Sequence, residues 1–196
     1  MAAKLTPTSY VVLGMVAMRG ATTSYDLKRA IGHSVGYFWP FPHAQLYSEP
    51  KRLVELGLLS VSSEQDGRRR QTYTVTDVGM KELRSWLAEP TNEQMQVRDV
   101  AEMKLFFGEF AEPDDLLALA RAQIGQHRER IATYVDIQQR FADREDVAVR
   151  MVPLRLGLEM ELAALRFWED YEREQTETRS ATDAQVPRRP ERADTP

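Results

Sequence analysis

Residues 42–73, PHAQLYSEPKRLVELGLLSVSSEQDGRRRQTY, decide the fold that we expect for this chain. Apolar residues recur at helical spacing over about residues 42–56, which predicts a helix with polar and basic side chains on its other face. Residues 58–62 and 71–75 have the composition of two strands, and Asp66-Gly67 between them is a hairpin-turn signal. A polar and basic helix followed by a basic hairpin is typical of a winged helix that reads DNA.

Further helices are expected on both sides of this stretch. A hydroxyl residue suited to capping a helix N-terminus opens each of them: Thr6, Thr23 and Thr76. Proline at position 7 strengthens the first signal, because its missing N–H costs nothing in the first turn of a helix. The three helices are expected over about residues 7–20, 24–31 and 76–88.

The remainder of the chain is expected to be helical, with a boundary at the break Glu89-Pro90-Thr91-Asn92. Apolar residues recur every three or four positions in two long segments. The apolar faces of the two predicted helices are too wide to be buried by packing against each other alone, so we expect the chain to form a dimer. The last segment has one valine and no aromatic residue, and we expect it to be disordered. The predicted fold is mainly α and has three parts. Residues 1–90 form a winged helix-turn-helix with a two-stranded wing, residues 91–175 a helical dimerisation domain, and residues 176–196 a disordered tail. The helices of the dimerisation domain are expected over about residues 97–110, 113–141 and 147–174.

Charge is distributed unevenly along the chain. The net charge is −4, but residues 1–90 hold 11 Lys and Arg against 8 Asp and Glu, whereas residues 91–175 hold 11 against 18. Phosphate attraction is screened over about 8–10 Å, so a local basic face matters more than the total. The charge therefore permits DNA binding by the first half and disfavours it for the second.

Composition excludes several other classes. There is no cysteine, and therefore no disulfide framework or zinc–cysteine site, which makes the cytoplasm the expected location. No apolar run reaches the roughly 18 residues of a membrane span. The three histidines, His33, His43 and His127, lack the spacing of metal ligands, and neither a G-x-S-x-G nucleophile motif nor a glycine-rich phosphate loop is present. We therefore expect no metal, no cofactor and no enzymatic activity.

The candidate DNA-binding residues come from three places. The arginine run at positions 68–70 is in isolation more often a solvated turn, but on a hairpin just after a helix with Lys51 and Arg52 it favours phosphate or minor-groove contact. On the predicted recognition helix, His43, Gln45 and Ser48 are candidates for base edges, and the hydroxyl of Tyr47 for a phosphate unless the ring lies in the core. Near the start of the second helix, Tyr25 and Lys28 are either phosphate anchors or ordinary surface residues. The full set of candidates is Tyr25, Lys28, His43, Gln45, Tyr47, Ser48, Lys51, Arg52, Arg68, Arg69 and Arg70.

Two locations are possible for the large aromatic residues in both halves of the chain. We expect most of them in hydrophobic cores, and the alternative is that some line an effector cavity between the two halves. The residues concerned are Trp39, Trp86, Phe106, Phe107 and Trp168.

Four segments together resemble the PadR family of bacterial transcription regulators, in particular members with a long helical C-terminal domain. The segments are LTPTSYVVLGMV, SYDLKRAI, AQLYSEPKRLVELGLL and RRRQTYTVTDVGMKELRSWL, and the resemblance covers about residues 5–175. It implies a homodimer joined by its C-terminal helices, usually a repressor, that binds a palindromic operator in double-stranded DNA and is released by a small molecule. Pro50 departs from the family pattern, and we expect it to bend the recognition helix.

Two alternatives remain open from the sequence. A winged helix also occurs as a protein-interaction adaptor, which would not bind DNA in a salt-dependent way. The chain could also act as an activator, because the sign of regulation depends on where the operator lies relative to the promoter.

Overall fold

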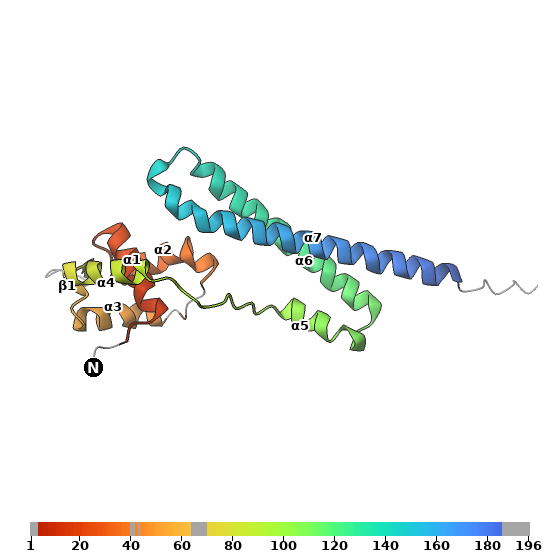
Figure 1. The fold of residues 1–196 in the computed structure, drawn as a ribbon, viewed down its shortest axis with the longest axis horizontal. Coiled ribbons are helices and arrows are strands. Elements are labelled where there is room, and N and C mark those ends of the chain that lie inside the picture. Colours follow the sequence, from red (N-terminus) through yellow and green to blue (C-terminus); the bar gives the residue numbers. More distant parts are fainter. Residues whose placement is uncertain (1–3, 40–41, 43, 64–69, 186–196) are drawn as a thin grey trace, which may run out of the picture. The chain divides into compact units, whose positions relative to one another are not determined.

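The structure is a computed structural model that describes residues 4–39, 42, 44–63 and 70–185, with side chains up to Ser180. The chain divides into two compact units, Met1–Gln94 and Met95–Pro196, and each is considered by itself (Figure 1).

The first unit is a winged helix-turn-helix. Its two strands form one antiparallel pair in which Leu59 lies opposite Val75 and Ser63 opposite Gln71. Thr22 extends this sheet by one bridge, donating to and accepting from the backbone of Tyr73 over 3.0 and 2.8 Å. The elements in chain order are α1 (Pro7–Arg19), α2 (Ser24–Gly32), a short 3₁₀ helix η1 (Val35–Tyr37), α3 (Gln45–Glu55), β1 (Leu59–Ser63), β2 (Gln71–Val75) and α4 (Asp77–Ala88).

The three predicted caps are present. Thr6 and Ser9 form a reciprocal capping box at the start of α1, the Thr23 hydroxyl accepts from the Asp26 N–H over 3.2 Å, and the Thr76 hydroxyl accepts from the Gly79 N–H over 3.0 Å. Each cap satisfies a backbone N–H that has no partner within its helix. The sequence-based starts of α1, α2 and α4 therefore agree with the structure to within a residue.

The core of the first unit is built around α1. Its apolar residues face α2, α3, α4 and β2, which is why so wide an apolar surface is buried. The buried core side chains are Val12, Leu13, Met15, Val16, Leu27, Ile31, Leu46, Leu53, Leu58, Leu59 and Tyr73.

The second unit is a helical hairpin preceded by a short helix. Helices α6 and α7 lie side by side along much of their length, with a small core that includes Ile124 and Trp168 (Figure 1). His127 on α6 pairs with Glu161 on α7 over 2.6 Å, which joins the two helices. The elements are α5 (Val100–Phe106), η2 (Gly108–Phe110), α6 (Pro113–Arg140), η3 (Glu145–Val147) and α7 (Ala148–Gln185).

Three helices differ from their expected bounds, and the first is α5, which spans Val100–Phe106 rather than about residues 97–110. Helix α3 begins at Gln45 rather than near residue 42, and α7 continues to Gln185, so residues 176–185, expected to be disordered, are helical. In this last part of α7, hydroxyls donate to carbonyls one turn earlier, as from Thr176 to Glu172 over 2.8 Å, and Arg179 pairs with Asp114 on α6. The ion pair links this part of α7 to α6, at a place where the apolar pattern has ended. Residues 186–196 of the predicted tail lie outside the described residues.

Most of the aromatic residues that we expected in the cores are exposed instead. Phe106 is 81% exposed and Phe107 55%, because α5 is short and buries only Ala101 fully against its neighbours. Trp39 is 42% exposed, and Trp86 is 41% exposed while its ring stacks on Tyr10 with centroids 4.5 Å apart. Of this group only Trp168 lies in a core. The described part of the chain contains no helix long and apolar enough to cross a membrane.

Candidate nucleic-acid interface

Helix α3 has one buried and one exposed face. Leu46, Pro50 and Leu53 point into the core at helical spacing, which leaves Ser48 and Lys51 on the opposite side in solvent. Pro50 is fully buried and α3 continues through it, so the proline does not interrupt the helix that carries the candidate residues.

The polar candidates on α3 are accessible. Tyr47 is 46% exposed, so the alternative that its ring lies in the core is wrong. Gln45 is exposed, and its amide oxygen accepts from the Thr8 hydroxyl on α1 over 3.2 Å. The Ser48 hydroxyl lies 3.4 Å from the carbonyl oxygens of Ala44 and Gln45, bonds long enough to be exchanged for another partner.

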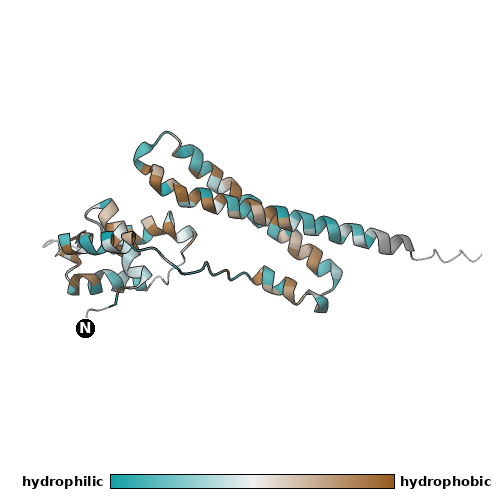
Figure 2. Ribbon diagram, in the orientation of Figure 1, coloured by the Kyte–Doolittle hydropathy of each residue, from teal (hydrophilic) through white to brown (hydrophobic). Residues whose placement is uncertain are grey.

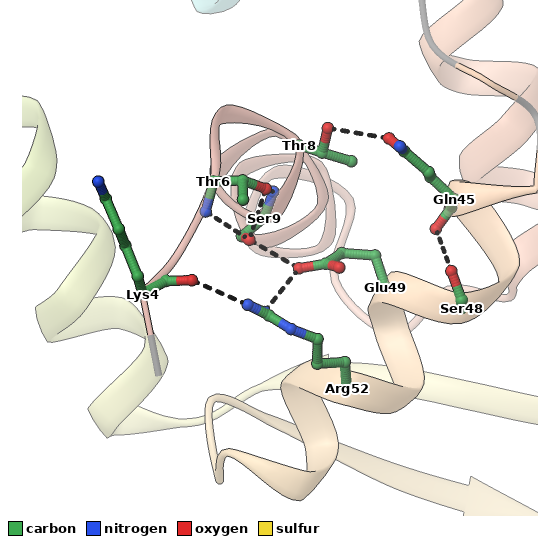
Figure 3. A network of polar contacts seen from close by, with 8 residues as sticks. All are labelled: Lys4, Thr6, Thr8, Ser9, Gln45, Ser48, Glu49 and Arg52. Atoms are coloured by element: carbon green, nitrogen blue, oxygen red, sulfur yellow. Dashed lines mark hydrogen bonds and ion pairs between the residues drawn. The ribbon is translucent and has the colours of Figure 1, made fainter. Parts of the chain in front are cut away.

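Arg52 differs from the other basic candidates because both ends of its guanidinium are occupied. One nitrogen donates to the Glu49 carboxylate over 3.1 Å and another to the backbone carbonyl of Lys4 over 3.0 Å (Figure 3). Glu49 also accepts from the buried Ser9 hydroxyl over 2.6 Å. The residues at one end of α1 and one side of α3 therefore form a single polar network, which we call the α1–α3 network: Lys4, Thr6, Ser9, Glu49 and Arg52.

The candidates outside α3 are exposed at α2 and at the start of β2. Tyr25 is 67% exposed and Lys28 is exposed. Arg70 pairs with Asp26 on α2 over 3.2 Å. The hydroxyl of Thr23, and after it the Arg70 guanidinium, hold the pKa of Asp26 below its usual value. The wing's arginine therefore has an acidic partner on α2.

Three sequence-based candidates, His43, Arg68 and Arg69, lie outside the described residues. Gln45, Tyr47, Ser48 and Lys51 are all exposed on α3, with Gln45 in contact with α1, and Arg52 lies in the α1–α3 network. Sequence reasoning did not identify Glu49 and Ser9. The spacing of Glu49 and Arg52 is a signal for an ion pair on one helix, but nothing local indicates that Ser9, forty residues earlier, completes it.

The described residues hold no cluster of three or more side chains that could bind a metal ion. The candidate residues on α3 carry amide, hydroxyl and cationic groups, which bind bases and phosphates.

Comparisons with known proteins agree with this fold. Residues 12–85 match the model of the transcriptional regulator PadR-like family, and residues 97–174 match the model named virulence activator alpha C-term. The negative transcriptional regulator PadR of Bacillus subtilis is 30% identical over 100 residues, which are 50% of this chain and 54% of that protein. The match therefore spans about half the length of this relative.

Solved structures resemble the chain over more of its length. PadR of B. subtilis in complex with operator DNA superposes with a TM-score of 0.77 at 22% identity, covering 85% of this chain and 98% of that one. The same protein in complex with p-coumaric acid gives 0.71 at 21% identity, covering 88% and 99%. The virulence activator AphA of Vibrio cholerae gives 0.68 at 23% identity, covering 87% and 99%. At these identities the likeness is one of fold.

The two matched families together cover both units of the chain. The proteins and families that it matches are transcriptional regulators rather than enzymes, which agrees with the absence of catalytic motifs from the sequence. Residues 12–85 therefore belong to the PadR-like family of transcriptional regulators.

Proposed function

We propose that the chain is a homodimeric repressor that binds a palindromic operator in double-stranded DNA and is released by a small-molecule effector. In this proposal residues 1–90 bind DNA and residues 91–175 join the two subunits. The observation that carries the proposal is the exposed polar and basic side of α3 in a winged helix-turn-helix: Gln45, Tyr47, Ser48 and Lys51. Because the operator is chromosomal DNA, the protein acts in the cytoplasm.

Helix α3 is the element that enters the major groove. Its exposed amide and hydroxyl, on Gln45 and Ser48, suit base edges, while Lys51 and Tyr47 suit phosphates. Arg70 approaches the DNA from the wing, together with Arg68 and Arg69, and Tyr25 and Lys28 anchor the backbone from α2. His43, just before α3, completes the set of base-edge candidates.

Homodimerisation is supported by the exposed apolar side chains of the second unit. Phe106 and Phe110 are each 81% exposed, and Leu156 on α7 is 64% exposed. Apolar residues recur along α5 and α7 (Figure 2). So much exposed apolar surface marks a protein interface, and a second copy would cover it. A two-fold dimer would place its two recognition helices on half-sites about 34–36 Å apart, one turn of DNA. The exposed apolar side chains of residues 100–110 and of α7 are Val100, Met103, Phe106, Phe107, Phe110, Val149, Val152, Leu156, Met160 and Phe167.

Repression is supported by the negative regulator of B. subtilis, the 30% identical relative. Activation is the second candidate, and a specific observation favours it: residues 97–174 match the C-terminal family named after virulence activators. The two differ in where the operator lies relative to the promoter, so the same DNA-binding surface serves both.

Release by an effector is supported by the relative that is known in complex with p-coumaric acid. A small molecule lowers DNA affinity only if it binds the DNA-incompetent arrangement better than the competent one, and the change is limited to that difference in affinity. The proposed effector class is therefore a small aromatic acid.

A binding experiment tests the proposal. A duplex is selected from a random-sequence library by repeated rounds of binding to the full-length protein, and its affinity is then measured at several salt concentrations. We expect a palindromic selected sequence, a linear decrease of log affinity with log salt, and weaker binding when p-coumaric acid is added. A protein-interaction adaptor would yield no selected sequence. An asymmetric selected sequence would contradict binding by a two-fold symmetric dimer.

A further inference from the structure

We propose that Glu49 is a positioning residue, which fixes the recognition helix α3 to the N-terminus of α1, and that Arg52 serves the same α1–α3 network rather than contacting DNA. The inference rests on the proposed function, because it states what sets the orientation of the DNA-reading helix. It removes one residue, Arg52, from the set that the sequence suggested for DNA contact.

The α1–α3 network joins residues that are forty positions apart in the chain (Figure 3). The Ser9 hydroxyl on α1 and the Arg52 guanidinium on α3 both donate to the same carboxylate oxygen of Glu49, over 2.6 and 3.1 Å. The side chain of Glu49 is only 14% exposed, and Ser9 is fully buried. A carboxylate so far out of water needs these donors, because an unsatisfied buried charge is strongly unfavourable.

The hydrogen bonds of Ser9 have one consistent direction. Its hydroxyl has a single proton, and the 2.6 Å bond assigns that proton to Glu49. The same oxygen then accepts from the backbone N–H of Thr6 over 2.9 Å, as the capping box of α1 requires. The cap of α1 and the carboxylate on α3 are therefore parts of one chain of hydrogen bonds, in which each bond polarises the next.

Arg52 completes the connection to the segment before α1. Its guanidinium bridges Glu49 and the backbone carbonyl of Lys4, which uses the fixed fork geometry that only arginine offers. Lys51, the next residue, is exposed, and its ammonium makes no hydrogen bond or ion pair with the described residues. Adjacent basic residues thus have different environments: Lys51 is available to a phosphate, and Arg52 is held by the protein.

The same side of α3 carries a candidate base reader. Gln45 lies one turn before Glu49, and its amide oxygen accepts from Thr8, the neighbour of Ser9 on α1. Two successive hydroxyl residues of α1 therefore hold two successive turns of α3. A recognition helix that shifts by about 1 Å loses well-aligned contacts, so this attachment affects discrimination between sequences more than general phosphate attraction.

The test measures affinity for two duplexes at several salt concentrations, using the full-length protein. One duplex is the sequence selected from the random library and the other is a scrambled sequence of the same length. The variants are Glu49→Ala, Glu49→Gln, Arg52→Ala, Arg52→Lys and Lys51→Ala, and a thermal melt of each establishes that it is folded at the assay temperature.

We expect Glu49→Ala and Arg52→Lys to weaken binding of the selected duplex about tenfold or more, as for the loss of a charged hydrogen bond, and binding of the scrambled duplex by less than about twofold. Their salt slopes should equal that of the wild type, whereas Lys51→Ala should lower the slope by about 0.9. Glu49→Gln keeps an acceptor for Ser9 and Arg52 and should recover most of the affinity.

Three results would overturn the inference. Arg52→Ala could lower the salt slope as much as Lys51→Ala, with Arg52→Lys fully active, which would make Arg52 a phosphate contact. Glu49→Ala could tighten binding of both duplexes, which would make Glu49 a repulsive surface charge. The variants could also weaken both duplexes equally, which would indicate a loss of folding stability alone.

Failure of the proposed function would look different, because the wild type would then select no sequence and Lys51→Ala would change nothing. If Glu49→Ala melts below the assay temperature, Arg52→Lys decides the question, since it retains both the charge and the Ser9–Glu49 bond.

Discussion

Gly79, in the first turn of α4, approaches the backbone of Leu58 so closely that a Cβ on it would lie 2.1 Å from the Leu58 carbonyl oxygen. The same oxygen accepts from the N–H of Thr76 over 3.1 Å. Helix α4 is thereby joined directly to the segment that leads from α3 into β1, and only glycine permits the contact.

Substitution Gly79→Ala should destabilise the protein by about 1–3 kcal/mol, because backbone atoms must move to admit the methyl group. The matched control is Gly14→Ala in α1, where a Cβ meets nothing within 4 Å and alanine should stabilise the helix by up to about 1 kcal/mol. Chemical denaturation measures both. Equal effects of the two substitutions would show that the close approach to Leu58 is relaxed in solution.

The stability contributed by Asp26 should depend on pH. Its pKa is lowered by the Thr23 hydroxyl and then by Arg70, so the ionised form is favoured in the folded state. The contribution is complete above the ordinary pKa of aspartate, about 3.9, and is lost as the pH falls through the lowered folded-state pKa.

The free energy of unfolding should therefore differ between wild type and Asp26→Ala at pH 7, by less than about 1 kcal/mol for so exposed a pair, and converge near pH 2. Arg70→Ala removes only the smaller cause and should retain most of this pH dependence. A difference that stays constant between pH 7 and pH 2 would exclude the ionised carboxylate as its source.

Disruption of the exposed apolar surface of the second unit should separate the subunits. The double substitution Phe106→Glu/Phe110→Glu places charges on side chains that are each 81% exposed in the single chain. We expect sedimentation to show a dimer for the wild type and a monomer for this variant. Val78→Glu, at a 62% exposed position on α4, is the control and should remain dimeric. A wild-type monomer, or a dimer unaffected by both changes, would contradict the proposed interface.

Asp26 and Arg70 should have opposite effects on DNA affinity. Arg70→Ala removes a wing cation and should lower the salt slope by about 0.9, whereas Asp26→Ala releases Arg70 from its 3.2 Å ion pair and should tighten binding. Arg84→Ala, at an exposed position on α4, is the control. If both substitutions weakened binding alike, the ion pair would orient Arg70 rather than compete with phosphate for it.

The sequence predicted those features of the fold that depend on nearby residues. Thr6, Thr23 and Thr76 signal helix starts because a cap involves residues only two or three positions apart, and the strand Gln71–Val75 follows from composition. The exposed candidates on α3 followed from helical spacing in the same way. Pro50 is buried in the core and α3 continues through it, while the bend expected at this residue stays a prediction.

Other features depend on contacts between distant residues or chains. The bond between Ser9 and Glu49 crosses forty residues, and together with the Arg52–Glu49 pair it supports the different role that we propose for Arg52. Phe106 and Phe110 are large and apolar, as core residues are, but they are exposed. An apolar pattern does not indicate whether a side chain is covered by its own chain or by another. Helix α7 continues beyond the apolar pattern, and its Arg179 pairs with Asp114 on α6, a contact between distant residues that an apolar pattern does not detect.

The most direct test of DNA binding by α3 is the salt dependence of Lys51→Ala on the selected duplex. Lys51 lies on the exposed side of α3, and Lys81→Ala, at an exposed position on α4, is the matched control. The account predicts a salt slope lower by about 0.9 for Lys51→Ala and an unchanged slope for Lys81→Ala. Identical slopes and affinities for the wild type and both variants would contradict it.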